Sequence, residues 1–119
     1  NYSATGFVDF PLVFNQNKVE ELICSGKVIN SHIKDLNLRE KEIHLESSDY
    51  LFLYTDGIIE EKNNLEQMYG KERLKNSLLS SLSSLQVEQM MSSIKNDFSN
   101  FILKSDYSDD ITCVLLKLN

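Results

Sequence analysis

The sequence predicts an α+β domain in which two helices cover one face of a mainly antiparallel sheet. Short apolar segments separated by turn residues fill the first half of the chain, up to Thr55. Two segments with helical apolar spacing then follow one another directly, and a last apolar segment, 111–118, closes the chain. Because the helices are consecutive and do not alternate with strands, we expect them to lie together on one side of the sheet.

The first strands are expected in segments 2–8, 11–14 and 19–24, which would form a meander. Residues 15–18, Asn-Gln-Asn-Lys, have the composition of a hairpin turn. Segment 40–46 alternates strictly and predicts a strand with one face in water. Its two sets of side chains are Lys41, Ile43 and Leu45 against Glu42, His44 and Glu46.

The central strand is expected at Tyr50–Thr55, where five large apolar residues follow one another. A run this short, bounded by turn residues, is typical of a strand buried on both faces. Asp56 follows it, and Gly57 would let the chain turn sharply there. A carboxylate at the end of a rigid strand is a good metal ligand, but an ordinary Asp-Gly turn explains this stretch equally well.

Two helices are expected at 71–82 and 87–102. Leu74, Leu78 and Leu82 are four residues apart in the first. The second keeps three-four spacing over its whole length and has Ser84 before it as a candidate N-cap. Its apolar residues, which predict core packing, are Val87, Met90, Met91, Ile94, Phe98, Phe101 and Ile102.

The composition limits the function classes. The chain has 119 residues, a net charge of −6 and a pI near 4.8, which argues against nucleic acid as a partner and is compatible with divalent cations. No apolar run is long enough to cross a membrane and no signal-peptide pattern opens the chain, so we expect a cytoplasmic domain. Cys24 and Cys113 lie in apolar segments; buried free thiols are the simpler interpretation, although a disulfide stays open.

Two acidic sites flank predicted central strands. Asp56 ends one strand, and Asp109-Asp110 directly precede another. If these strands are antiparallel neighbours, Asp56 and Asp109 meet at the same edge of the sheet. Converging carboxylates repel one another unless a cation lies between them, and a hard divalent ion prefers oxygen ligands. The sequence therefore predicts that Asp56 shares an ion with one of the two later aspartates.

Three motifs occur in order: Tyr54–Glu60 (YTDGIIE), Glu66–Leu74 (EQMYGKERL) and Asp109–Thr112 (DDIT). Together they resemble the closing half of a metal-dependent, PPM-type (phosphatase 2C-like) protein phosphatase domain. The branch is that of stage II sporulation protein E and the phosphatases that regulate stress sigma factors. The resemblance covers residues 36–118 well and the first third of the chain only loosely.

The resemblance implies part of an αββα sandwich and hydrolysis of a phosphoserine or phosphothreonine ester by a water that two Mn²⁺ or Mg²⁺ ions activate. By the same resemblance Asp56 and Asp109 match metal-ligand aspartates, and both would be catalytic. Asp110 would support them by a hydrogen bond, Gly57 matches the turn glycine, and Glu60 would orient the loop. The implied partner is a phosphorylated protein, with an anti-anti-sigma factor as the typical substrate of this branch.

The sequence also departs from the family. No motif supplies the aspartate that bridges both metals, Phe7 stands where histidine is usual, and the glycine loop is eroded at 26–30. We therefore expect residues 1–119 to be the C-terminal portion of a single serine phosphatase domain, cut from a longer chain and weak or inactive alone. A sensor domain, with or without a membrane tether, would lie upstream. Unpaired sheet edges would favour a homodimer.

Two other functions share part of this sequence pattern. A pseudophosphatase would keep the fold and use the edge at Asp56 to bind a regulatory protein; the eroded motifs favour it, and the two aspartates disfavour it. A haloacid dehalogenase-type phosphatase is rejected, because Tyr54 stands in the place of its nucleophilic aspartate. His32 and His44 have no partner at ligand spacing and are read as surface residues.

Overall fold

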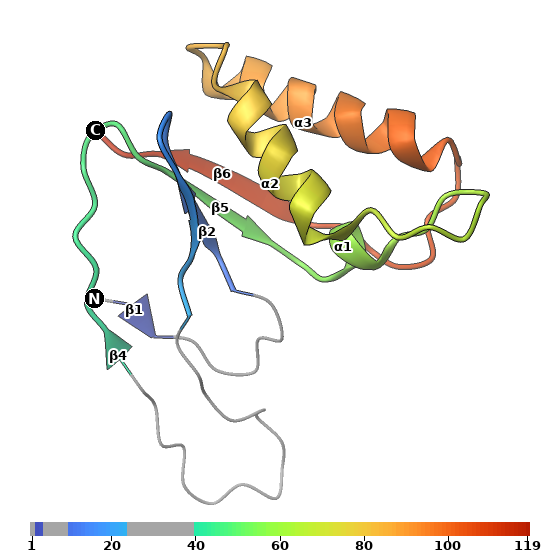
Figure 1. Cartoon of the computed structure of the whole chain (residues 1–119), viewed down its shortest axis with the longest axis horizontal. Helices are drawn as coiled ribbons and strands as arrows, with labels where there is room; N and C mark the ends of the chain where they lie inside the picture. Colours follow the sequence, from blue (N-terminus) through green and yellow to red (C-terminus); the bar gives the residue numbers. More distant parts are fainter. Residues whose placement is uncertain (1, 4–9, 24–39) are drawn as a thin grey trace, which may run out of the picture.

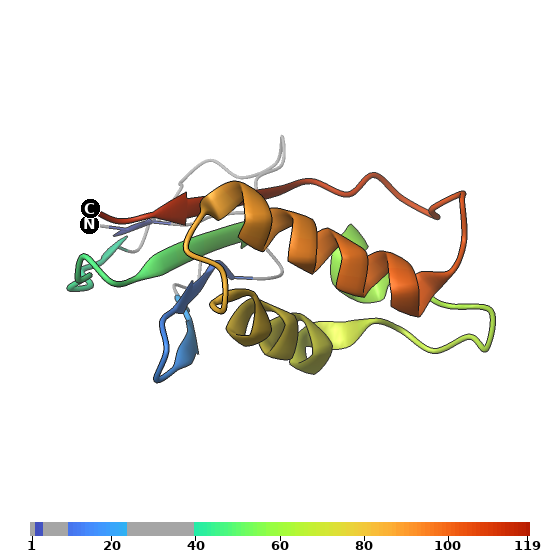
Figure 2. The same cartoon turned by 90° about the horizontal axis from the view of Figure 1, so that it is seen from above.

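The computed structural model describes residues 2–3, 10–23 and 40–119 of the chain. The strands are β1 (Tyr2–Ser3), β2 (Leu12–Phe14), β3 (Val19–Glu21), β4 (Glu40–Lys41), β5 (Tyr50–Tyr54) and β6 (Cys113–Lys117). The helices are α1 (Gly57–Glu60), α2 (Gly70–Ser81) and α3 (Val87–Ile102). Figures 1 and 2 show α2 and α3 side by side over one face of the sheet, which confirms the predicted α+β class.

The main sheet has the strand order β3-β2-β5-β6, and each neighbouring pair is antiparallel. The hairpin between β2 and β3 is closed by a 3.0 Å hydrogen bond from the Asn15 N–H to the Lys18 carbonyl, as its turn composition predicted. β5 pairs with β6 along its whole length, from Tyr50 opposite Lys117 to Tyr54 opposite Cys113. The two strands that the aspartates flank are therefore adjacent and antiparallel, which is the condition for Asp56 and Asp109 to lie at the same edge.

The predicted meander is wrong for its first strand. β1 pairs with β4 in a separate two-stranded sheet, with Tyr2 opposite Lys41. The strand predicted for 40–46 ends at Lys41, although Ile43 and Leu45 are half-buried between exposed neighbours. A strand needs a partner's backbone groups as well as alternating side chains, and among the described residues no strand pairs with 42–46. The predictions at 4–9 and 24–39, including Cys24 and His32, lie outside the described residues.

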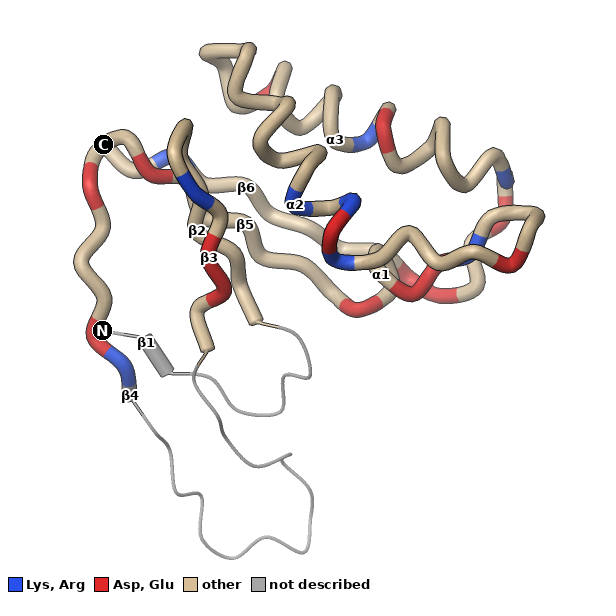
Figure 3. Tube along the Cα trace, in the orientation of Figure 1, with Lys and Arg blue, Asp and Glu red and all other residues tan. Residues whose placement is uncertain are grey.

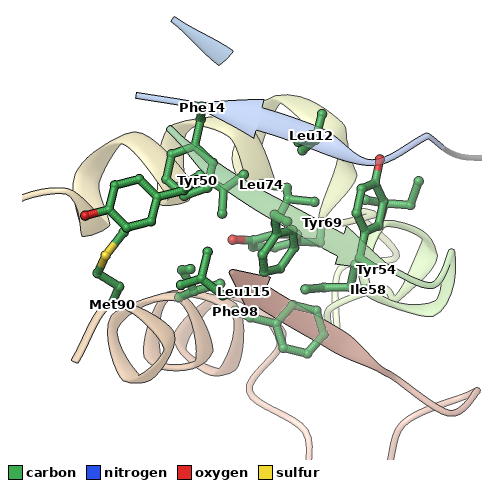
Figure 4. Packing of buried hydrophobic residues seen from close by; sticks show 14 of the residues in the cluster. Leu12, Phe14, Tyr50, Tyr54, Ile58, Tyr69, Leu74, Met90, Phe98 and Leu115 are labelled. Atoms are coloured by element: carbon green, nitrogen blue, oxygen red, sulfur yellow. The ribbon is translucent and has the colours of Figure 1, made fainter. Parts of the chain in front are cut away.

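The core lies between the sheet and the helices. Tyr50 and Tyr54 of β5 lie in one buried cluster with Leu74 of α2 and Met90 of α3 (Figure 4). Phe52 of β5 belongs to the same cluster. The alternate residues of β5, at 51 and 53, are only half-buried. The central strand is thus fully buried on the helix-facing side alone, which corrects the prediction of burial on both faces.

The helices follow their predicted stripes. Leu74, Leu78 and Met90 are fully buried. The predicted cap is wrong: α3 begins at Val87 after Gln86, and no side chain caps it. Ser84 instead donates its backbone N–H to the Ser81 carbonyl and so completes the turn that ends α2. In the part of the chain that the structure describes, no helix is both long and apolar enough for a membrane crossing.

Candidate functional site

Asp56 lies at the junction of β5 and α1. Its carbonyl accepts the N–H groups of Ile59 at 3.1 Å and Glu60 at 3.0 Å, so its backbone is part of the first helical turn. Its half-buried side chain does not cap that helix. The carboxylate is therefore held on a rigid strand end and left available for a ligand.

The pairing of β5 with β6 continues past the strands and brings the second acidic segment to Asp56. The Thr55 N–H donates to the Thr112 carbonyl at 3.0 Å, and the Thr112 N–H donates to Thr55 Oγ1 at 3.1 Å. If the register of β5 and β6 is extended by two residues, Asp56 falls opposite Ile111. Figure 3 shows the acidic segments of α1 and of the loop before β6 at the same end of the molecule.

Gly57 marks the closest approach of these segments. A Cβ atom at Gly57 would lie 2.6 Å from the carbonyl oxygen of Asp110, a distance that real side chains do not tolerate. The prediction that Gly57 provides a special turn geometry is wrong, because the positive-φ residues of the described chain do not include it. Glycine is needed here for space, because the backbone of Asp110 occupies the position of a side chain.

Asp109 and Asp110 are both exposed. The Asp110 N–H donates to Asp109 Oδ1 at 2.8 Å, which restrains the Asp109 side chain. Among the described residues, no lysine or arginine forms an ion pair with Asp56, Asp109 or Asp110. Three aspartates thus lie on adjoining segments at one end of the β5–β6 pair, and none of them has an ion-pair partner within the described ranges.

The two acidic residues at the end of α1, Glu60 and Glu61, lie in different environments. Glu60 is exposed, and no hydrogen bond of its carboxylate is observed among the described residues. Glu61 is only 3% exposed, and both of its carboxylate oxygens accept hydrogen bonds from Ser108. Local pattern gave no signal for this contact, because 47 residues separate the partners.

The family model for stage II sporulation protein E (SpoIIE) matches residues 2–119. The chain belongs to the SpoIIE family. No curated protein matches the sequence significantly. The family assignment agrees with the resemblance carried by the motifs around Asp56 and Asp109.

Two solved structures share the fold of this SpoIIE-family chain. The SiaA-PP2C domain of Pseudomonas aeruginosa matches with a TM-score of 0.76 and 19% identity, over 97% of this chain and 45% of that chain. The RsbU and RsbW domains of Rv1364c from Mycobacterium tuberculosis match with a TM-score of 0.70 and 18% identity, over 98% of this chain and 31% of that chain. The fold is therefore PP2C-like, and the chain spans less than half the length of either structure.

PP2C-like phosphatases are generally metal-dependent, so the aspartates at this edge are candidate metal ligands. In the described ranges no group of three or more His, Cys, Asp or Glu side chains gathers closely enough to hold an ion. Mg²⁺ is commonly bound by one or two carboxylates, with waters and substrate phosphate oxygens completing its shell. Asp56 and Asp109 offer hard oxygen donors of this kind, so they fit a partly hydrated ion better than a closed protein cage.

A pocket of about 240 Å³ lies beside this edge, between α1, α3 and β6. Its apolar wall includes Ile58 and Ile111, the neighbours of Gly57 and Asp110. Cys113, a free cysteine, also lines it, and burial raises the pKa of its thiol. Cys113 also packs against the hydrophobic core, so its side chain contributes to the apolar wall of the pocket.

Proposed function

We propose that this chain is part of a metal-dependent protein phosphatase that hydrolyses phosphoserine or phosphothreonine esters. The observation that carries the proposal is the meeting of the Asp56 strand end with the Asp109-Asp110 segment at one sheet edge, where no basic residue of the described ranges is ion-paired with these aspartates. Membership of the SpoIIE family and the PP2C-like fold support it.

Asp56 and Asp109 would hold the metal and are the proposed catalytic residues. Bound Mn²⁺ or Mg²⁺, two ions in an intact domain, would supply a deprotonated water and take up charge on the phosphoryl oxygens. Asp110 contributes through its backbone, by restraining the Asp109 carboxylate and by packing against Gly57. Glu60 at the exposed end of α1 keeps its proposed role in orienting the loop.

The chain is proposed to be the C-terminal portion of a single serine phosphatase domain. It covers 45% of the SiaA-PP2C chain, so other ligands and substrate contacts would come from further sequence. The proposed substrate is a phosphorylated protein in a bacterial sigma-factor pathway, of the anti-anti-sigma type, and the proposed location is the cytoplasm. The resemblance to the RsbU domain of the second structure supports such a regulatory role. A sensor domain elsewhere in the protein would control it.

Isothermal titration of Mn²⁺ tests the shared ion. Asp56→Asn and Asp109→Asn should each weaken Mn²⁺ binding at least about tenfold, because each removes a charged ligand. Asp106→Asn is the matched control, since Asp106 is an exposed aspartate in the same loop. Equal Mn²⁺ affinity in all four proteins, or the absence of binding to the unmodified chain, would contradict the proposal.

A regulatory binding module without catalysis is the second candidate. The observation that favours it is the absence of a three-residue metal cluster among the described residues. Release of phosphate from a phosphoserine protein by the complete protein distinguishes the two. A phosphatase loses this activity in Asp109→Asn, whereas a binding module releases no phosphate and still binds the phosphoprotein in that variant.

A further inference from the structure

Glu61 is a buried carboxylate that the proposed chemistry does not use. It is 3% exposed, and no lysine or arginine of the described chain is paired with it. A buried charge without a cation is unfavourable unless hydrogen bonds satisfy it.

Both oxygens of Glu61 are directed at one residue of the acidic loop. Oε2 accepts the Ser108 backbone N–H at 2.8 Å, and Oε1 accepts the Ser108 hydroxyl at 3.1 Å. Two bonds to one residue fix its orientation as well as its distance, and hydrogen bonds to a charged acceptor are the stronger kind. Ser108 directly precedes Asp109, so the clamp acts on the backbone that carries the proposed ligand.

Glu61 is itself held from both sides. Its N–H donates to the Gly57 carbonyl at 3.2 Å, and its carbonyl accepts the Tyr69 N–H at 2.9 Å. Tyr69 is 2% exposed and belongs to the core. The clamp is therefore anchored to α1, the element that begins directly after Asp56.

A second contact restrains the loop on the other side of Asp109. The Asp110 carbonyl packs against the Cα of Gly57, where a Cβ would clash. Asp109 thus lies between two fixed points, Ser108 bound to Glu61 and Asp110 packed on Gly57. The two residues that hold these points, Gly57 and Glu61, belong to the short segment that follows Asp56.

We infer that Glu61 is a positioning residue: through Ser108 it sets the place of Asp109 relative to Asp56. The inference rests on the proposed function for the use of that geometry, because the two carboxylates are the proposed metal ligands. Glu61 acts through the loop and not on the ion, since both of its oxygens are engaged by Ser108. Loss of a group that holds a metal ligand in place lowers metal affinity by about tenfold to a hundredfold.

The test compares Glu61→Ala, Glu61→Gln and Ser108→Ala with Glu88→Ala, an exposed acid in the first turn of α3. Mn²⁺ affinity and the amide hydrogen-exchange rates of Ser108 and Asp110 are measured for each. Glu61→Ala should weaken Mn²⁺ binding about tenfold or more and speed exchange at Ser108. Glu61→Gln should keep most of the Mn²⁺ affinity and most of the protection from exchange at Ser108. Its amide oxygen can accept the Ser108 N–H while its NH₂ donates to the Ser108 hydroxyl. Glu88→Ala should change neither.

Unchanged Mn²⁺ affinity and unchanged exchange in folded Glu61→Ala would overturn the inference, even if its melting temperature fell. If Glu61→Ala does not fold, Ser108→Ala decides, because it removes only one of the two bonds: weaker Mn²⁺ binding supports the clamp, and unchanged binding overturns it. Failure of the proposed function shows differently, as absent Mn²⁺ binding in the unmodified protein. Faster exchange at Ser108 and Asp110 in the variants would then still support positioning of the loop, and unchanged exchange would overturn it.

Discussion

At the scale of single residues, Gly57 shows how a missing side chain can define a site. The Asp110 carbonyl occupies the place of its Cβ at 2.6 Å, and Ile111 Cγ1 lies 3.4 Å from the same point. Both α1 and the acidic loop depend on this approach. The sequence identified the position correctly as one that needs glycine, but assigned the need to backbone angles.

The first prediction is that Gly57→Ala separates these two segments. The added methyl group must displace backbone and not a flexible side chain, so the free energy of unfolding should fall by about 1–3 kcal/mol. Mn²⁺ affinity should fall with it, because the loop that carries Asp109 moves. Urea unfolding and Mn²⁺ titration measure the two effects, with Ser93→Ala on the exposed face of α3 as the control. A Gly57→Ala protein as stable as the control would show that the close approach does not exist.

At the scale of elements, Tyr69 joins α2 to α3. It directly precedes α2, and its ring makes edge-to-face contacts with Phe98 at 5.1 Å and Phe101 at 5.7 Å between centroids. Its hydroxyl donates to Asp97 Oδ2 at 2.5 Å. Burial, with a smaller contribution from Asp97, raises the pKa of Tyr69 above the ordinary value of 10.0. The neutral phenol is therefore part of the packing of the two helices.

The second prediction concerns alkaline pH. Because the pKa of Tyr69 is higher in the folded state, its contribution is present below pH 10 and is lost as the pH rises through and beyond the unfolded value. The unfolding free energy of the wild type should fall above pH 10 more steeply than that of Tyr69→Phe. At neutral pH the variant should lose about 0.5–1.5 kcal/mol with the hydrogen bond.

Urea unfolding at a series of pH values measures how the unfolding free energy changes with pH, and tyrosinate absorbance reports the ionisation of tyrosine. Tyr107→Phe is the control, since Tyr107 is 45% exposed and also packs on Phe98. Parallel pH profiles for the wild type and Tyr69→Phe would contradict the assignment.

Some elements and contacts were predictable from the sequence, and others were not. The helices were predictable because three-four spacing is local, and the same residues, such as Leu74, Leu78 and Ile94, are buried. The predicted length of β4 was too great, because a strand depends on a partner elsewhere in the chain. The meeting of Asp56 with the acidic loop was predictable, since it needed only that β5 and β6 be antiparallel neighbours. The hydrogen bond that Ser108 donates to Glu61 was not predictable, because it depends on how α1 and a loop pack in three dimensions.

At the scale of the whole molecule, the helices cover one face of the sheet. The helices pack on the side of Phe52 and Leu115, whereas Val114 and Leu116 on β6 are 43% and 44% exposed. Apolar side chains of Leu53 and Val114, with Pro11, line a shallow pocket of about 150 Å³ on that sheet. Within the described residues β6 pairs with one strand only, so its outer edge is also open. Exposed apolar surface next to an open edge favours association.

The last prediction is that the isolated chain forms dimers through this face and edge. Sedimentation velocity across protein concentrations should show a monomer–dimer equilibrium, which Leu116→Lys should shift to monomer because a lysine on an edge strand opposes pairing. Leu85→Lys, at an 85% exposed position between the helices, should leave the dimer intact. A monomeric wild type by light scattering would contradict the prediction.

A longer protein that completed an αββα sandwich would give the opposite result for the same substitution. There the second sheet would bury Leu116, and Leu116→Lys would lower the unfolding free energy by placing a charge in the core. In the isolated chain the same side chain is already 44% exposed, so stability should change by no more than about 0.5 kcal/mol. Comparing the two proteins therefore separates a face used between copies of the chain from a face that belongs inside one domain.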